Sequence, residues 1–374
     1  MVSPRVLRAL SKPVLSHTSK EFVDGFVEAL NLQRWLFMTE GTPFLLAGSG
    51  TLGMEAAAAN VVEKGDRVLC VENGFFGEKW AEIVAAHGGT ADRMTFEWGA
   101  AIDLNMIKER LDNGDYKALT VEHVDTSTGI ANPLEKIGDL VKGTDTLYLV
   151  DSVCGLGGMP LKMDEWNIDI CLTGSQKALG APPGITMLCV NSRAWKAIES
   201  RKTPIADYYA DMRRWKPVME NPRGYFATPA TGMVLGMLEA LRIIQEEGLE
   251  ERWRRHRVFS EAFRAGLAAI GVKSFPAAGS EAHTLSVPVI PDGIKDSDVR
   301  ELMQLKYGVI IAGGLGRTAG KAVRIGHMGS ATMNDLLATM GAFEMSLKEF
   351  GYKIKLGTGI GALEEQLASY RVTS

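Results

Sequence analysis

The chain has 374 residues, of which 46% are hydrophobic and 23% charged, and its formal net charge is −4. This length exceeds what a single core fills efficiently, so we expect a large domain and a smaller one. The absence of a concentrated basic stripe argues against a general nucleic-acid or anionic-membrane binder, and no apolar run is long enough to span a bilayer. We therefore expect small molecules and another protein chain as partners.

The cysteines indicate the cellular compartment. All four lie in or beside apolar runs, without a CxxC pair or an adjoining histidine (Cys70, Cys154, Cys171 and Cys189). Buried thiols in a reducing compartment account for this pattern, and neither a disulfide nor a metal site is expected. The first fifteen residues contain prolines and basic residues instead of an uninterrupted apolar core, which makes a poor signal peptide. We therefore expect a cytoplasmic protein.

The first half of the chain alternates between helix and strand. Apolar residues at helical spacing predict a helix over residues 20–36. A strand, a glycine-rich turn and an alanine-rich helix follow over 43–66. Later strands are predicted within 67–77, 116–129, 146–158, 168–177 and 185–192, with helices over 78–87 and 133–142. Near-continuous apolar strands separated by helices indicate an α/β fold, with a mostly parallel sheet covered on both faces.

Polar residues fall just after the apolar run of several different strands. In an open α/β sheet, ligands bind at the carboxyl ends of the strands. We therefore expect five such residues to converge on one crevice: Ser49, Asn73, Thr126, Asp151 and Lys177.

The pattern changes after Ser200. Residues 207–231 are aromatic, basic and interrupted by three prolines, so we expect an irregular segment there. An amphipathic helical region over 233–269, broken near Gly248, is expected to link the two domains. Short strands and helices then predict a small α+β domain, with strands within 284–290, 307–314 and 322–328 and helices over 296–306 and 332–350.

The predicted domain organisation follows these changes in pattern. It comprises an N-terminal segment (1–15), a large domain (16–250), a small C-terminal domain (251–350) and a tail (351–374) whose end is expected to form a short helix.

The turn Gly48-Ser49-Gly50-Thr51-Leu52-Gly53 has two interpretations. It matches the dinucleotide-binding pattern G-x-G-x-x-G, with Glu72 about twenty residues later where the ribose would bind. An NAD-dependent oxidoreductase is therefore one alternative. Small residues at a helix N-terminus also form a general phosphate site, or allow tight packing of strand and helix.

Lys177 and Asp151 favour a different cofactor. A lysine between a strand and a Gly/Pro-rich turn is a solvated loop residue unless a pocket desolvates it, in which case its amine can attack a carbonyl. Asp151 is either a local cap or a carboxylate that keeps a heterocyclic nitrogen protonated. The phosphate nest, the acid and the lysine together fit pyridoxal phosphate, whereas a dinucleotide leaves the lysine without a role.

The sequence resembles the class V aminotransferases of the alanine–glyoxylate and serine–pyruvate group, especially the fungal alanine–glyoxylate branch. The resemblance runs from about residue 14 to 345, in the stretches LSHTSKEF, PFLLAGSGTLGMEAAA, ALTVEHVDTSTG, VDSVCGLGG, DICLTGSQKALGAPPG, MRRWKPVMEN, GYFATP, GVIIAGG and VRIGHMG. It implies a fold-type I transferase that binds pyridoxal 5'-phosphate. The implied reaction moves an amino group from alanine or serine to glyoxylate or pyruvate by a ping-pong Schiff-base mechanism.

The resemblance also implies roles for individual residues. Lys177 falls on the Schiff-base lysine and Asp151 on the partner of the ring nitrogen, while Thr126 would bond the ring hydroxyl. Val153 would pack on one face of the ring, and Phe76 stands where many relatives have a tryptophan or another aromatic residue stacked on the ring. The implied phosphate-binding residues are Ser49, Gly50, Thr51 and Gln176.

Three further implications concern the partner subunit, the substrate and rival reactions. Tyr225 and Thr228 match residues that complete the site of the partner in a homodimer, and Arg324 matches the arginine that binds the substrate carboxylate. Judged alone, Arg324 is equally compatible with a buried ion pair. Relatives begin with a Gly-Pro-rich loop that lines the substrate pocket, ahead of the segment that starts here at Met1, and this loop is absent from this sequence. Among other fold-type I enzymes, cysteine desulfuration needs a C-terminal cysteine, and none follows Cys189.

Overall fold

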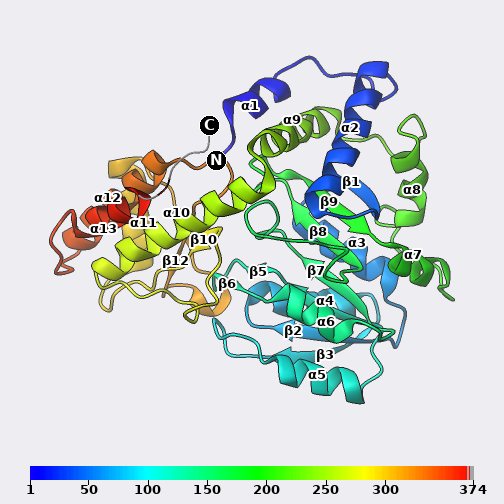
Figure 1. The fold of residues 1–374 in the computed structure, drawn as a ribbon, viewed down its shortest axis with the longest axis horizontal. Helices are drawn as coiled ribbons and strands as arrows, with labels where there is room; N and C mark the ends of the chain where they lie inside the picture. The colour runs from blue at the N-terminus through cyan, green and yellow to red at the C-terminus, as the bar shows by residue number, and fades with distance from the viewer. Residues whose placement is uncertain (369, 371–374) are drawn as a thin grey trace.

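The larger lobe is built on a seven-stranded sheet. In the computed structural model, which describes residues 1–368 and 370, the strand order is β1-β9-β8-β7-β4-β2-β3 (Figure 1). The strands from β8 to β3 are parallel, whereas β9 is antiparallel to both β8 and β1. The strands are β1 (Thr42–Gly48), β2 (Arg67–Glu72), β3 (Thr90–Thr95), β4 (Ala118–Glu122), β7 (Leu147–Asp151), β8 (Ile170–Gly174) and β9 (Gly184–Val190).

Helices flank this sheet, as the alternating pattern predicted. After β1, α3 (Gly50–Val61) packs against β8 and β9, while α4 (Phe75–Ala86) follows β2 and packs against β2, β3 and β4. Together with α9 (Thr231–Glu247), α2 (Lys20–Phe37) covers the β1–β9 end of the sheet. The expected mixed, mostly parallel sheet is confirmed. The lobe also contains α1 (Pro4–Leu10), α5 (Leu104–Asn113), α6 (Leu134–Val141), α7 (Ser192–Glu199) and the short hairpin β5 (Val124–Asp125) and β6 (Ile130–Ala131).

Local chemistry sets the boundaries of the long helices. The N-cap of α2 is Ser19, whose hydroxyl accepts a hydrogen bond from the Phe22 amide. The predicted break near Gly248 separates α9 (Thr231–Glu247) from α10 (Leu249–Ala269). Gly248 has φ of 78°, a conformation that a residue with a Cβ rarely adopts. These helix predictions are confirmed.

The expectation of an irregular segment over 207–231 is wrong in part. Residues Met212–Glu220 form α8, in which Pro217 lies inside the helix. Asp211 caps it by accepting from the Arg213 amide, and Trp215 is buried, which anchors its apolar side to the core. The prolines and basic residues of this segment obscure both the cap and the helical spacing of the buried side chains in the sequence.

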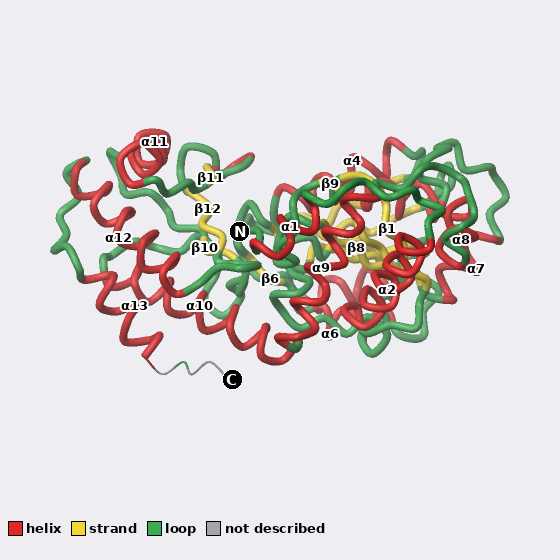
Figure 2. Tube along the Cα trace, turned by 90° about the horizontal axis from the view of Figure 1, so that it is seen from above, coloured by secondary structure: helices red, strands yellow, loops and turns green. Residues whose placement is uncertain are grey.

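The smaller lobe has its own hydrophobic core. It contains α10, α11 (Asp296–Tyr307), α12 (Met333–Glu349), α13 (Thr358–Ala368), the 3₁₀ turn η1 (Gly316–Thr318) and a three-stranded antiparallel sheet, in the order β10 (Leu285–Ser286), β12 (Val323–Gly326) and β11 (Ala312–Gly313). Figure 2 shows α10 running from the centre of the molecule into this lobe. The strands are much shorter than the apolar runs that predicted them.

The ends of the chain pack onto the two lobes. Val6 of α1 joins the core of the larger lobe, and Leu363 and Leu367 of α13 join that of the smaller one. The predicted terminal helix is therefore present as α13; residues 369 and 371–374 of the predicted tail lie outside the described part, and the domain boundaries stay a prediction. In the described residues, no helix is both long and apolar enough to cross a membrane.

Candidate active site

A cavity lies at the carboxyl ends of the parallel strands. Its volume is about 190 Å³. It brings together all nine residues that were predicted to hold a cofactor within one subunit, namely Ser49, Gly50, Thr51, Phe76, Thr126, Asp151, Val153, Gln176 and Lys177. Asn73 was expected in the same crevice, but it is not among the lining residues. Its side-chain Nδ2 instead donates to Asn132 Oδ1 at 2.8 Å, which joins the loop after β2 to the residue after β6.

The first turn of α3 forms one wall of the cavity. Ser49 is the N-cap, and its side chain makes no capping hydrogen bond, so its hydroxyl is available to a ligand. The amides of a helix N-terminus favour an anion such as phosphate. Gly50 is required there, because a Cβ on it would lie 2.4 Å from Val153 Cγ2. The small residue thus lets the helix start and Val153 approach each other closely.

Asp151 ends β7 inside the cavity. Its side chain is 3% exposed, and its Oδ1 accepts a hydrogen bond from the Val153 amide at 2.7 Å. Burial raises the pKa of Asp151 to about 6, although the Val153 amide and the positive charge of Lys177 both act to lower it. Asp151 is therefore a buried hydrogen-bond acceptor whose ionisation is opposed by burial and favoured by these two neighbours.

Lys177 lies in the turn between β8 and β9. The Ala181 amide donates to Ser175 O at 3.0 Å, and Ser175 Oγ donates to Pro182 O at 2.6 Å, which closes the turn on itself. Gly180 has φ of 71°, consistent with its place in this tight turn. Lys177 remains half-buried with its side chain lining the cavity, and the neighbouring Gln176 is exposed at the rim.

Asp125 organises the wall that carries Phe76 and Thr126. Its carboxylate accepts from the amides of Phe76, at 2.9 Å, and Ser127, also at 2.9 Å. It therefore holds the start of α4 against the loop after β4. Thr126 is buried and Phe76 half-buried in this arrangement, and both line the cavity.

Sequence reasoning missed four residues of the cavity. They are Met54, Glu122, Val124 and Cys154. Three are apolar or weakly polar, and no pattern separates them from core residues. Glu122 could have been predicted, because it is an acidic residue at the end of the buried strand β4. Burial, together with the negative charge of Asp151, raises its pKa well above the ordinary value.

Arg324 lies outside this cavity, on β12 of the smaller lobe. Its Nε donates to Gly313 O at 2.7 Å, and within the described part of the chain neither Nη atom has a hydrogen-bond partner and the side chain has no ion pair. Partial burial lowers its pKa, while Cys154 and Asp125 lie near enough for their charges to act in the opposite sense. The buried-ion-pair interpretation of this arginine therefore finds no partner in the described residues.

Tyr225 and Thr228 also lie apart from the cavity. Both are exposed on the loop before α9, with their hydroxyl oxygens 3.5 Å apart. Tyr225 is 69% exposed, which is unusual for an aromatic side chain of this size. Within one subunit these two residues therefore make no contribution to the site.

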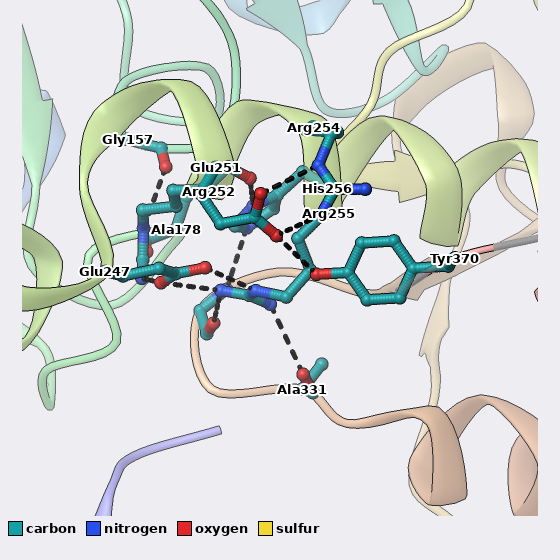
Figure 3. Close-up of polar contacts among 11 residues, drawn as sticks. Gly157, Ala178, Glu247, Glu251, Arg252, Arg254, Arg255, His256, Ala331 and Tyr370 are labelled. Carbon is teal, nitrogen blue, oxygen red and sulfur yellow. Dashed lines mark hydrogen bonds and ion pairs between the residues drawn. The ribbon is translucent and has the colours of Figure 1, made fainter. Parts of the chain in front are cut away.

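A network of charges connects the two loops that flank the site. Arg252 of α10 is 2% exposed and donates to Gly157 O and Ala178 O, beside Lys177 (Figure 3). On the next turn of the helix, Arg255 donates to the carbonyl oxygens of Gly329 and Ala331 in the segment after β12. Both arginines pair with Glu247 (Figure 3). The network thus ties the lysine turn to the segment that follows Arg324.

Glu72 decides against the dinucleotide interpretation. Its carboxylate is 1% exposed, pairs with Arg93 Nε at 2.6 Å and accepts from Thr95 Oγ1 at 3.1 Å. A residue that binds a ribose must offer its carboxylate to solvent or to ligand. Here both oxygens are already engaged by β3.

The fold and the cavity define the class of protein. An amine, a buried carboxylate and a helix N-terminus at the carboxyl ends of a mostly parallel sheet are the groups required by pyridoxal phosphate, which carries an aldehyde, a basic ring nitrogen and a phosphate. The residues present therefore fit this cofactor.

Comparison with known proteins gives the family. The profile of the family described as Aminotransferase class-V matches residues 15–336, and the chain belongs to that family and uses pyridoxal 5'-phosphate as cofactor. An uncharacterized aminotransferase of Methanocaldococcus jannaschii is 39% identical, covering 98% of this chain and 95% of that protein. Alanine–glyoxylate aminotransferase 1 of Saccharomyces cerevisiae is 37% identical, covering 91% and 92%. The crystal structure of ureidoglycine–glyoxylate aminotransferase from Bacillus subtilis superimposes with a TM-score of 0.95 at 32% identity, covering 98% and 96%.

Proposed function

We propose that this transaminase moves the amino group of a small amino acid, alanine or serine, to glyoxylate or pyruvate. The observation that carries the proposal is the cavity in which Lys177 and Asp151 lie beside the N-terminus of α3. The similarity to the yeast alanine–glyoxylate enzyme supports alanine as donor, and glyoxylate stands in the names of both that protein and the Bacillus neighbour. Among the described residues that line the cavity, Lys177 is the one basic residue, so no basic cluster for a second carboxylate is found there.

The cofactor would be held from three sides. Lys177 would bond its aldehyde carbon, and Asp151 would accept a hydrogen bond from its ring nitrogen. Thr126 would bond the ring hydroxyl, with Val153 and Phe76 on the two ring faces. Its phosphate would be held by groups that converge at the start of α3 and in the lysine turn, namely Ser49, Gly50, Thr51 and Gln176.

The bound cofactor supplies an electron sink for the carbanion that forms at the α-carbon of the amino acid. Lys177 would be the base that takes the α-proton at Nζ and later returns it. Asp151, when ionised, would accept a hydrogen bond from the ring nitrogen and so favour its protonated form. Arg324 would orient the substrate carboxylate through its two Nη atoms, a bidentate geometry that lysine does not reproduce.

The site would be completed in a homodimer. The exposure of Tyr225 and Thr228 supports their contact with a second subunit, whose cofactor phosphate they would reach. Hybrid dimers test this arrangement: mixing inactive Lys177→Ala and Tyr225→Ala subunits should restore activity, because one of the two sites then has both residues. Hybrids that remain inactive would contradict the shared site.

The four free, buried cysteines support a cytoplasmic location.

A substrate panel tests the proposed reaction. Alanine, serine and aspartate should each be assayed as donors with glyoxylate and with pyruvate as acceptors. We expect transfer from alanine or serine to exceed transfer from aspartate by at least tenfold, and a preference for aspartate would refute the substrate assignment.

Arg324 provides the second test of the proposed reaction. Arg324→Lys should raise KM for the amino acid by about 10- to 150-fold, the range for a lost hydrogen bond to a charged group. Cofactor binding should stay unchanged in this variant, because Arg324 lies outside the cofactor cavity. An unchanged KM would remove Arg324 from the substrate site.

A further inference from the structure

Two carboxyl groups lie side by side at the base of the cofactor cavity. Glu122 and Asp151 are the last residues of the adjacent parallel strands β4 and β7, and they are paired in the strand register. Side chains at paired positions point to the same face of a sheet. Both of these line the cavity, and they are 2% and 3% exposed. The two acids are therefore close neighbours in a site with little water.

The surroundings of the two acids differ. Asp151 accepts the Val153 amide and lies near the cation of Lys177. The groups that act on the Glu122 side chain are Asp151, Asp125 and Cys154, all of which oppose its ionisation. Its Oε1 is buried with no hydrogen-bond partner in the described residues. Among the described residues, the charges that act on Glu122 are all negative, whereas Lys177 favours the ionised form of Asp151.

Two buried carboxyl groups in contact cannot both be ionised at moderate cost. One proton must therefore reside on the pair, and the unequal surroundings assign it to Glu122. A protonated carboxyl group is a hydrogen-bond donor, and the Asp151 carboxylate is the acceptor next to it.

We propose that Glu122 is a positioning residue of this site, whose neutral carboxyl group donates a hydrogen bond to Asp151 and keeps that carboxylate ionised and oriented toward the cofactor ring. The proposal rests on the proposed role of Asp151 as partner of the ring nitrogen. Glu122 acts only through Asp151. Because it is protonated, it carries no negative charge that would repel the Asp151 carboxylate.

Two substitutions separate this role from simple packing. Glu122→Gln retains a donor of the same shape and should leave the affinity for pyridoxal phosphate within about threefold of the unmodified protein. Glu122→Met has a similar length without a donor, and we expect it to weaken that affinity by about 10- to 150-fold at pH 7. Equal effects of the two substitutions would overturn the proposal, because packing alone does not distinguish them.

The proton itself is observable in the cofactor-free protein. Difference infrared spectra of unmodified protein and Glu122→Gln near pH 7, where an ordinary carboxyl group is ionised, should show the carbonyl stretch of one protonated carboxyl group that the variant lacks. Its absence would overturn the proposal even if transamination is established. Should Glu122→Met fail to fold, this spectrum decides the question. Failure of the unmodified protein to bind pyridoxal phosphate would instead refute the proposed cofactor site and leave the spectral result intact.

Discussion

The close approach of α3 to Val153 allows the geometry of the phosphate wall to be tested without any assay of activity. Gly50→Ala would place a Cβ 2.4 Å from Val153 Cγ2, about 1 Å closer than the 3.4 Å at which ordinary contact begins. Carbon atoms do not approach this closely without a shift, so α3 or Val153 must move. Overpacking of this kind costs about 1–3 kcal/mol. We expect the free energy of unfolding of the cofactor-free protein to fall by that amount.

A double-mutant cycle in urea attributes this loss to the contact. Val153→Ala alone should cost about 1 kcal/mol, because the side chain is only half-buried. In the double variant the new methyl group occupies the vacated space, so the loss should be smaller than the sum of the single losses by at least about 1 kcal/mol. Gly361→Ala in α13 is the control: its Cβ would meet nothing within 4 Å, and it should not destabilise the protein. Single losses that add within about 0.5 kcal/mol would refute the proposed clash.

Two further predictions concern charge. Because burial raises the pKa of Asp151 to about 6, its contribution to the stability of the cofactor-free protein is fully present below an ordinary aspartate pKa of ~3.9 and is lost as the pH rises through about 6. As the pH rises from about 4 to about 6, the free energy of unfolding of the unmodified protein should therefore fall by about 3 kcal/mol relative to that of Asp151→Asn. Parallel pH profiles of urea unfolding for the two proteins would contradict this. Glu247→Leu leaves Arg252 buried without its carboxylate and should cost about 3–5 kcal/mol of unfolding free energy; a loss below about 1 kcal/mol would show that the carbonyl oxygens of Gly157 and Ala178 suffice.

The residues of the cofactor cavity were predictable from the sequence by one rule, that ligands bind at the carboxyl ends of parallel strands. Residues such as Ser49, Asp151 and Lys177 follow apolar runs directly, and the carboxyl ends of parallel strands meet at one edge of the sheet. The rule failed for Asn73, which occupies an equivalent place but turns toward Asn132. Whether such a side chain faces the cavity or bonds to a neighbouring loop depends on the loop conformation, which the pattern of the strands does not determine.

Other features depend on contacts between distant segments. Glu122 reads as the polar end of a strand, and only the register of β4 against β7 places it beside Asp151. Likewise, Arg252 and Arg255 belong to a charged helical stretch that resembles any solvated face, yet Arg252 is almost fully buried against the lysine turn. The spacing of apolar residues predicted the helix, whereas the partners of its arginines depend on how the two lobes are arranged.

The most direct test of the account asks which lysine bonds the cofactor. Protein loaded with pyridoxal phosphate should be reduced with borohydride, digested and analysed by mass spectrometry. The account predicts the added phosphopyridoxyl mass on the peptide that contains Lys177, and its loss in Lys177→Ala. Attachment instead to Lys79, whose ammonium lies 5.0 Å from the centre of the Phe76 ring, or to no lysine, would contradict it.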